Sequence, residues 1–250
     1  MATRGLRPIV AIYSTFLQRA YDEIIHDVCL QKLPVIFAID RAGFVGEDGP
    51  THHGLFDISF LRHIPNLVVM APKDAKEMKM MFKFALDYNG PSAIRYPRGI
   101  VPEIELPSAG IVRGTGEILR EGSEIALIAA GSCVMPAMQA AERLELAGVS
   151  AQVVNARFIK PLDRELLLSV AERIPMIVTI EENALEGGFG SSVLECLNDA
   201  GMNVRVKRLG IPDKFIEQAG IESLKAKYGI DEDGIFLASL SFLREHTFSN

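Results

Sequence analysis

The amino-acid sequence predicts an α/β protein of two domains, each built around a mainly parallel β-sheet. Three observations support this fold class. Short runs of uninterrupted apolar residues, typical of strands buried on both faces, alternate with amphipathic stretches at helical spacing. This alternation lapses once, between residues 99 and 110, where prolines and isolated acidic residues indicate a linker. Hydrophobic residues make up 48% of the 250 residues, enough to form a substantial core.

The first domain, residues 1–98, is expected to contribute four strands and two helices. In the first helix Leu17 and Ile24 share one apolar face. Asp74 is expected to cap the second helix, because Glu77 stands three residues later as in a capping box. The expected strands span residues 8–13, 34–39, 67–70 and 92–96, and the expected helices span residues 15–30 and 74–88.

The second domain, residues 111–250, repeats the same alternation of strands and helices after the linker at residues 99–110. The expected strands span residues 124–130, 151–154, 176–180 and 204–206. The expected helices span residues 134–147, 163–174, 191–200, 222–228 and 235–246.

Composition excludes several classes of partner. The net charge of -6 offers no basic stripe for a nucleic acid and no polybasic patch for an anionic membrane. No apolar run approaches the roughly 18 residues of a membrane span. Cys29, Cys133 and Cys196 stand far apart in apolar surroundings, which favours buried, reduced thiols. We therefore expect a cytoplasmic protein that binds neither nucleic acid nor membrane.

The densest polar segment is DRAGFVGEDGPTHHG, residues 40–54, which follows the second expected strand. Parallel sheets place ligand sites at the carboxyl ends of their strands, and a polar loop of this length is typically functional. Arg41 can bind an anion through its planar guanidinium, Asp48 can accept protons or hydrogen bonds, and His52 and His53 can shuttle protons near neutral pH.

Two alternatives for this loop remain open from local sequence. It could be a solvated connector in which Asp48 and Thr51 only cap turns. It could also ligate a metal through Asp48, His52 and His53, but adjacent histidines on a loop seldom face one ion. We therefore predict no metal ligands here.

A second cluster, Tyr13, Phe16 and Arg19, follows the first expected strand and would lie beside the polar loop. Aromatic side chains at a strand-to-helix turn suit stacking on a flat ring. The alternative, equally compatible with the local sequence, is that Phe16 packs in the core and Arg19 is an ordinary surface charge.

Two arginines end the fourth expected strand in the segment RYPRG. Alternation along a strand sends Arg95 and Arg98 to different sides, so one of them could join Arg41 in binding a phosphate. In the second domain, the glycines of 187–190 follow Glu181 and Glu182 and precede a helix. A phosphate loop is conceivable there, but a helix entry held at a domain contact is the favoured interpretation.

Four motifs together resemble the 1-deoxy-D-xylulose-5-phosphate synthase family, whose members are thiamine-diphosphate enzymes related to transketolase. The motifs are YSTFLQRAYD at 13–22, the loop at 40–54, RYPRG at 95–99 and RFIKPLD at 157–163. The resemblance covers nearly the whole chain. It implies a partial pyrimidine-binding domain followed by a transketolase C-terminal domain.

The resemblance also implies an activity and a cofactor site. This family condenses pyruvate with D-glyceraldehyde 3-phosphate and releases CO2, which feeds isoprenoid, thiamine and pyridoxal synthesis. By the match, Phe16 would stack on the aminopyrimidine ring of thiamine diphosphate, with Tyr13 and Arg19 beside it.

The same match implies the substrate-binding residues. Asp48 and His52 would face the reacting carbons, where a developing alkoxide needs a proton donor. Arg41 and Arg98 would hold the phosphate of the aldehyde, which two guanidinium groups suit better than lysines.

The family's N-terminal domain, which binds Mg2+ and the cofactor's diphosphate, has no counterpart here, and neither does its ylide-promoting glutamate. The resemblance thus implies a C-terminal portion, inactive without that domain and dimeric with a second copy. We also expect an unpaired sheet edge and an apolar face near residues 1–35.

Two other hypotheses remain. The chain could be the smaller subunit of a split transketolase or of a 2-oxo-acid dehydrogenase, although the THHG loop, Arg41 and RYPRG favour the synthase. It could also be a non-catalytic assembly fragment that folds and dimerises.

Overall fold

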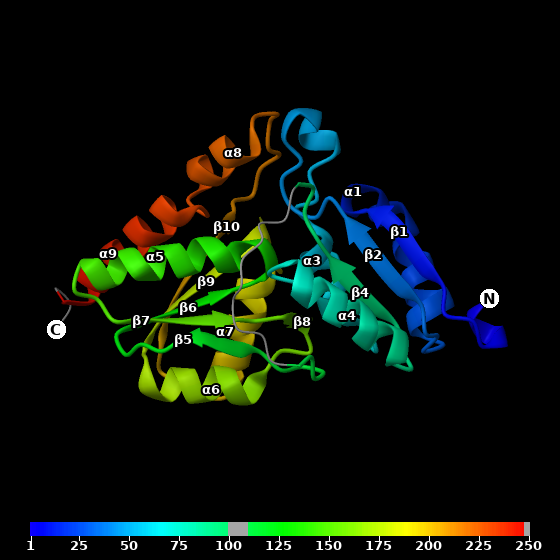
Figure 1. Ribbon diagram of the computed structural model, residues 1–250, viewed down its shortest axis with the longest axis horizontal. Helices are drawn as coiled ribbons and strands as arrows, with labels where there is room; N and C mark the ends of the chain where they lie inside the picture. The colour runs from blue at the N-terminus through cyan, green and yellow to red at the C-terminus, as the bar shows by residue number, and fades with distance from the viewer. Residues whose placement is uncertain (100–109, 248–250) are drawn as a thin grey trace.

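The computed structural model describes residues 1–99 and 110–247, so most of the expected linker at 99–110 lies outside the described residues. Two five-stranded sheets lie side by side, one in each half of the chain, and helices cover both faces of each (Figure 1). The predicted fold class, two α/β domains with mainly parallel sheets, is confirmed. The exact domain boundaries stay a prediction.

The first sheet has the order β1-β2-β4-β3-β8, and its first four strands are parallel. All four strands expected in this half are confirmed, because each is a short apolar run. The fifth, β8, was not expected: it comes from the second half of the chain and pairs antiparallel with β3. The strands are β1 (Ile9–Tyr13), β2 (Ile36–Asp40), β3 (Val68–Met70), β4 (Ser92–Arg95) and β8 (Phe158–Lys160).

The helices of the first half follow the expected apolar stripes. The expected helix at 15–30 is an irregular series of short turns, and its predicted inward residues Leu17 and Ile24 are buried. Asp74 caps α4 as predicted, accepting a hydrogen bond from the Glu77 backbone nitrogen at 2.7 Å. The segments are α1 (Ser14–Leu17), a 3-10 turn (Gln18–Ala20), α2 (Tyr21–Glu23), a π-helical turn (Ile24–Cys29), the 3-10 segment η4 (Gly46–Thr51), α3 (Asp57–Leu61) and α4 (Ala75–Asp87).

The second sheet has the order β10-β9-β6-β7-β5, with only β5 antiparallel. The edge strand β5 was missed because two of its four residues are charged and all four are only partly buried. Strands β9 and β10 run further than expected, which carries the Glu181 and Glu182 side chains to the domain junction. The strands are β5 (Glu117–Arg120), β6 (Ile125–Ala129), β7 (Ala151–Asn155), β9 (Met176–Ala184) and β10 (Arg205–Ile211).

All five helices expected in the second half are confirmed. The helices α6 and α7 pack on one face of the sheet, and α5, α8 and α9 pack on the other (Figure 1). Their bounds are α5 (Val134–Leu146), α6 (Arg164–Arg173), α7 (Phe189–Asp199), α8 (Ile221–Tyr228) and α9 (Glu232–Thr247).

A buried ionic network joins the two halves. The Glu77 carboxylate of α4 accepts from Arg157 Nε at 2.8 Å and from Asn155 Nδ2 at 2.9 Å. Lys73 Nζ lies 3.2 Å from the same carboxylate, and Arg157 Nη2 lies 2.7 Å from Glu117 Oε2. Removing one member would leave a buried charge uncompensated, so the network fixes one domain against the other.

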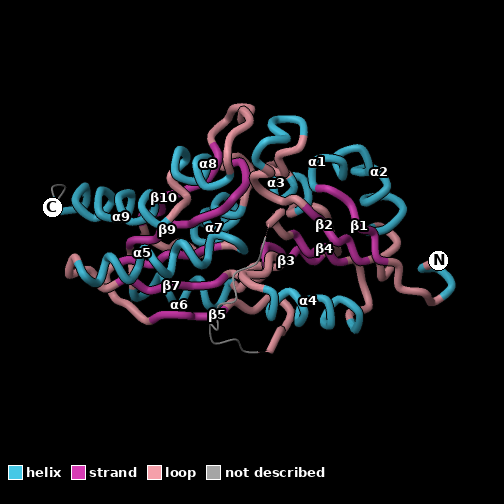
Figure 2. The backbone as a smooth tube through the Cα atoms, turned by 45° about the horizontal axis from the view of Figure 1, so that its top comes forward, coloured by secondary structure: helices cyan, strands magenta, loops and turns pink. Residues whose placement is uncertain are grey.

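The first sheet ends in an exposed strand. In Figure 2, β1 forms the outer edge of its sheet, and among the described strands it pairs with β2 alone. Ile9 is 50% exposed and Leu30 is 71% exposed, so the unpaired edge and apolar face predicted for residues 1–35 are confirmed. Association through this face stays a prediction.

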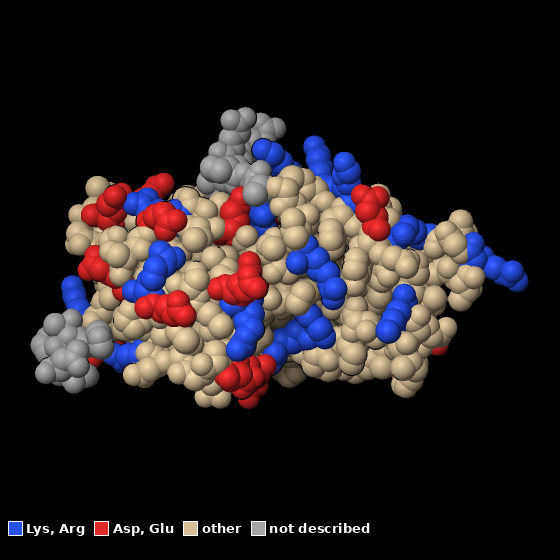
Figure 3. All heavy atoms as spheres, turned by 90° about the horizontal axis from the view of Figure 1, so that it is seen from below, with Lys and Arg blue, Asp and Glu red and all other residues tan. Residues whose placement is uncertain are grey.

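The surface carries both basic and acidic side chains, as the composition indicates. On the face shown in Figure 3, basic side chains are spread over the whole view, while acidic ones lie mostly over its left half. Within the described residues, no helix is both long enough and apolar enough to span a bilayer.

Candidate active site

The polar loop leaves the carboxyl end of β2, beside the end of β1, as the sequence predicted. Its two ends are tied together by paired backbone hydrogen bonds between Gly43 and Gly54, at 2.7 and 2.8 Å. A Cβ at Gly54 would lie 2.2 Å from the Arg41 carbonyl oxygen, so only glycine fits this close approach. Between these ends, η4 carries Asp48, and His52 follows η4 directly.

An aromatic pair stands beside this loop. The Tyr13 and Phe16 rings stack with centroids 5.5 Å apart, and the His52 ring meets Phe16 edge-on at 5.4 Å. Phe16 is 45% exposed, so the alternative that it packs in the core is wrong. The Arg41 guanidinium lies 4.1 Å from the Tyr13 ring centroid, which links the aromatic pair to the charged part of the loop.

Two guanidinium groups converge on one carboxylate. Asp48 Oδ2 accepts from Arg41 Nη1 at 2.9 Å and from Arg98 Nη1 at 2.8 Å. Arg98 Nη1 also donates to the Val45 carbonyl at 3.3 Å. The Nε and Nη2 groups of both arginines have no partner among the described residues, so donors remain for a bidentate anion.

His52 lies half-buried at the end of η4. Its Nδ1 lies 2.9 Å from Thr51 Oγ1, and the Thr51 carbonyl accepts from Thr15 Oγ1 at 3.1 Å. These contacts orient the ring, and its Nε2 has no hydrogen-bond partner within residues 1–99 and 110–247. That nitrogen is therefore available to exchange a proton with a bound molecule.

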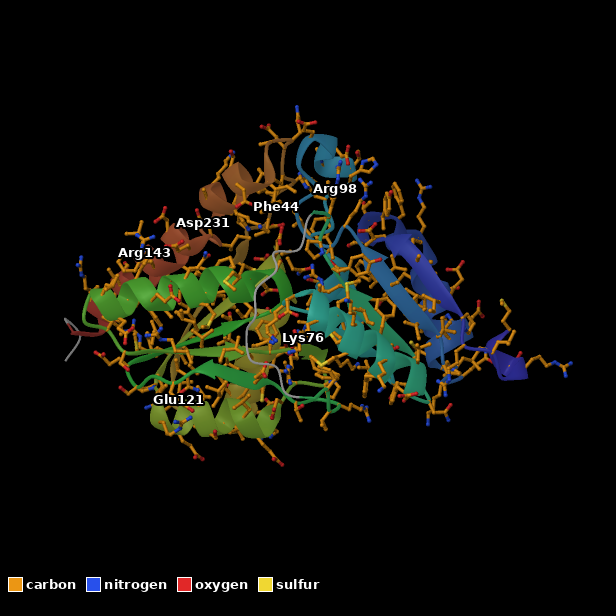
Figure 4. All side chains as sticks on the ribbon, viewed as in Figure 1. Phe44, Lys76, Arg98, Glu121, Arg143 and Asp231 are labelled. Atoms are coloured by element: carbon orange, nitrogen blue, oxygen red, sulfur yellow. The ribbon has the colours of Figure 1, made fainter. Side chains whose placement is uncertain are left out.

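The other predicted residues lie elsewhere. Arg19 is exposed, and no hydrogen bond, ion pair or ring contact joins it to another described residue. Arg95 is buried and pairs with Asp57 at 2.7 Å, whereas Arg98 faces the loop. The two arginines point to different sides as predicted, but β4 ends at Arg95, so strand alternation is not what places Arg98. Of the two arginines, Arg98 is therefore the one that shares Asp48 with Arg41. Figure 4 labels Arg98 close to Phe44.

Local sequence did not reveal how the second domain holds the loop. The buried Glu182 carboxylate of β9 accepts from the Phe44 backbone nitrogen at 2.8 Å and from Ser132 Oγ at 2.6 Å. His53, considered as a proton shuttle, is only 3% exposed and is bonded on both ring nitrogens. The expected strand ended at residue 180, whereas β9 continues to Ala184 and so includes Glu182.

The glycine-rich turn of the second domain is already occupied from within. Glu181 accepts from the backbone nitrogens of Phe189 at 2.7 Å and Gly190 at 2.8 Å, at the start of α7. Burial raises the pKa of Glu181 to about 7, and those two hydrogen bonds offset part of the shift. The favoured interpretation, a helix entry at a domain contact, is confirmed.

The cysteines carry no sign of reactivity. Cys29 and Cys133 are buried, and desolvation raises the pKa of Cys29 to about 11 and that of Cys133 further still. Cys196 is only partly buried but packs against the core. Among the described residues, no group of three His, Cys, Asp or Glu side chains is placed to hold a metal ion.

Models of two families match the chain. The transketolase pyrimidine-binding domain matches residues 1–103, and the transketolase C-terminal domain matches residues 114–235. The first model includes the polar loop and Arg98, and the second begins shortly before β5.

Curated relatives are similar over nearly the whole chain. The chain is 58% identical over 246 residues to 1-deoxy-D-xylulose-5-phosphate synthase 1 of Geobacter sulfurreducens, covering 97% of this chain and 39% of that protein. It is 54% identical over 251 residues to 1-deoxy-D-xylulose-5-phosphate synthase of Thermomicrobium roseum, covering 98% and 40%. The chain thus spans about two fifths of the length of these relatives.

Solved structures share the fold. A split-gene transketolase, described as an inactive beta4 tetramer, superposes with a TM-score of 0.88 at 32% identity, covering 97% of this chain and 78% of that one. A transketolase from Campylobacter jejuni gives a TM-score of 0.77 at 22% identity, covering 94% and 35%. The chain belongs to the transketolase family, as a pyrimidine-binding domain followed by a C-terminal domain that together resemble the corresponding part of 1-deoxy-D-xylulose-5-phosphate synthases.

Proposed function

We propose that this chain is the C-terminal portion of a 1-deoxy-D-xylulose-5-phosphate synthase. In the complete enzyme it would take part in the thiamine-diphosphate-dependent condensation of pyruvate with D-glyceraldehyde 3-phosphate, with loss of CO2. The observation that carries the proposal is the convergence of Arg41 and Arg98 on Asp48, beside the Tyr13 and Phe16 rings and His52. The high identity to named synthases supports the same assignment.

The aromatic pair fits the aminopyrimidine end of the cofactor. Phe16 is exposed and backed by the Tyr13 ring, which suits stacking on a flat heteroaromatic ring. The diphosphate and Mg2+ would be held by the N-terminal domain of the complete enzyme. When bound, thiamine diphosphate supplies a nucleophilic carbon that permits decarboxylation of pyruvate. Arg19 stays a predicted neighbour of the cofactor.

Arg41 and Arg98 would bind the aldehyde's phosphate. Each donates to Asp48 through Nη1, which leaves the Nε and Nη2 donors of both for phosphate oxygens. Asp48 holds the two guanidinium groups near each other and offsets part of their repulsion before the dianion arrives. This arrangement would favour a phosphorylated aldehyde over a neutral one.

His52 would donate the proton that the aldehyde oxygen needs when the new carbon–carbon bond forms. Thr51 Oγ1 fixes the Nδ1 side of the ring, so the proton would leave from Nε2. A positioned donor stabilises the negative charge that develops on that oxygen. Asp48, the second residue predicted to be catalytic, would face the reacting carbons together with His52.

We also propose binding partners and a cellular location for this chain. The exposed β1 edge and its apolar neighbours fit association with the N-terminal domain and with a second copy in a homodimer. The free cysteines and the mild negative charge support a cytoplasmic protein. The isolated chain is expected to be inactive.

A second candidate is the smaller subunit of a split transketolase. The similarity to a split-gene transketolase favours it, because this chain covers 78% of that chain at 32% identity. The two functions differ in their donor: the synthase uses pyruvate and releases CO2, whereas a transketolase uses a ketose phosphate. A non-catalytic assembly fragment would use neither.

Turnover assays separate these candidates. The chain is assayed alone and with the N-terminal portion of the Geobacter sulfurreducens synthase, with thiamine diphosphate and Mg2+, using pyruvate or a ketose phosphate as donor. We expect CO2 release only with the N-terminal portion, pyruvate and D-glyceraldehyde 3-phosphate. Turnover of the ketose phosphate would establish the second candidate, and no turnover in any mixture would contradict both.

A further inference from the structure

A buried histidine connects the polar loop to the second domain. His53 is only 3% exposed and follows His52 directly. Its Nδ1 accepts from the Val45 backbone nitrogen at 3.2 Å, and its Nε2 lies 3.3 Å from the Glu217 carbonyl oxygen. Phe44 covers the ring edge-on at 5.7 Å, so solvent does not substitute for either contact.

The two partners dictate one protonation state. A backbone N–H can only donate and a carbonyl oxygen can only accept, so Nδ1 must be bare and Nε2 must carry the proton. Burial lowers the pKa of His53 from 6.5, which favours the neutral ring. The hydrogen bond to the Glu217 carbonyl opposes this shift, as do the charges of Glu182 and Asp48, whereas His52 adds to it.

Both partners are parts of the site's framework. Val45 immediately precedes η4, and its carbonyl accepts from Arg98 at 3.3 Å. Glu217 lies in the segment after β10, whose next residue packs on the same turn: a Cβ at Gly49 would be 3.2 Å from Gln218 Cβ. His53 therefore fixes the start of η4 and ties it to the second domain.

We infer that His53 is a positioning residue for the reaction proposed above: its neutral, Nε2-protonated ring holds η4 so that Asp48 and His52 meet Arg98 and the aldehyde. His53 itself touches neither substrate nor cofactor. Protonation at Nδ1 turns an N–H toward the Val45 N–H, breaks that hydrogen bond and releases the start of η4. The site is thereby coupled to pH through a residue that does no chemistry.

Substitutions separate positioning from packing. Glutamine offers one acceptor and one donor but does not titrate in this range, so His53→Gln keeps the connection without the pH response. Leucine fills the space without either hydrogen bond. His26 is a matched control, because it is exposed and its ring pairs, among the described residues, with Asp22 four residues earlier in the chain.

The first test needs no activity. Long-range 1H–15N spectra of the histidine-labelled full chain report the tautomer of each ring, and hydrogen exchange reports the Val45 amide. We expect His53 as the Nε2–H form at pH 7, titrating below pH 6.5 together with faster Val45 exchange. His53→Leu should expose the Val45 amide at every pH, and His26→Gln should not. A charged or Nδ1–H ring at pH 7, or unchanged Val45 exchange in His53→Leu, overturns the inference.

The second test uses the enzyme reconstituted with the N-terminal portion. A loop displaced by about 1 Å lowers kcat on the order of ten- to a hundredfold, so we expect that loss in His53→Leu. His53→Gln should restore kcat and remove the part of the acid limb of the pH profile that His53 causes. Equal losses in both variants would assign His53 to packing alone. If no mixture turns over, including wild type, the proposed function fails while the spectra still decide the role of His53.

Discussion

Two glycine-rich polar turns follow parallel strands of this molecule, and they differ in how far the protein itself fills their hydrogen-bonding groups. The turn after β9 is closed: Glu181 accepts from two free amides at the start of α7, and Glu181, Phe189 and Gly190 are all buried. The loop after β2 is open: Arg41 and Arg98 share Asp48 but keep donors without a partner among the described residues. Polar residues mark a binding site when their hydrogen-bonding capacity is left unfilled by the protein itself.

The largest loss of stability should come from removing the Glu181 carboxylate from the closed turn. Glu181→Ala leaves two buried amides at the start of α7 without acceptors, at a cost on the order of 3 kcal/mol in the free energy of unfolding. Urea denaturation at pH 7 measures it, and the exposed neighbour Glu186 supplies the control Glu186→Ala. A change below about 0.5 kcal/mol, as is usual for surface sites, would contradict the role given to Glu181.

The exposed arginines of the open loop should affect activity more than stability. Arg98→Ala is expected to lower kcat/KM for D-glyceraldehyde 3-phosphate about ten- to a hundredfold in the reconstituted enzyme, because a charged hydrogen bond contributes about 1.5–3 kcal/mol. Its stability should change by at most about 1 kcal/mol, since the ion pair is partly exposed.

Arg120 pairs with Glu145 on the surface of the second domain and gives the matched control Arg120→Ala. Kinetics with phosphorylated and unphosphorylated aldehyde decide the point. An equal loss of kcat/KM for both aldehydes in Arg98→Ala would argue against phosphate binding.

Glycine substitutions sharpen the contrast at a smaller scale. Gly54→Ala places a Cβ 2.2 Å from the Arg41 carbonyl, so the loop must shift and the unfolding free energy should fall by about 1–3 kcal/mol. Gly187→Ala meets no atom closer than 3.7 Å and carries only the strain of its φ of +65°, roughly 1 kcal/mol. Thermal unfolding of both variants checks the order, and a larger loss for Gly187→Ala would reverse it.

A further effect is a dependence of stability on pH that comes from Glu181 in the closed turn. The pKa of Glu181 is raised to about 7 from 4.5, so between these values the folded protein binds more protons than the unfolded chain. The free energy of unfolding should therefore decrease as pH rises through this window. Urea titrations at several pH values, with Glu181→Gln as reference, isolate the contribution. A slope of the opposite sign in the difference would show that Glu181 is not a raised-pKa group.

Local patterns predicted the strands and helices that are apolar or regularly amphipathic. The strands β5 and β8 escaped because they are short, partly polar and paired antiparallel with strands distant in sequence. Their existence depends on tertiary contacts that no local pattern encodes.

The candidate site was predictable where residues share one end of the sheet. Tyr13, Phe16, Arg41, Asp48 and His52 follow neighbouring parallel strands, so their proximity follows from topology. The roles of Glu182 and His53 were not predictable, because their partners come from the other domain. Arg19 shows the converse, since its sequence neighbours the cluster while its exposed side chain contacts none of it.

In the proposed enzyme, the open loop and its aromatic pair form half of the thiamine-diphosphate site. Calorimetric titration of thiamine diphosphate with Mg2+ tests it directly, using the chain alone, the N-terminal portion of the Geobacter sulfurreducens synthase alone, and the two together. We predict saturable binding that is much tighter for the mixture than for either part, and weaker when the mixture carries Phe16→Ala. Equal affinity of the N-terminal portion with and without this chain would show that the loop and the aromatic pair do not contribute to the cofactor site.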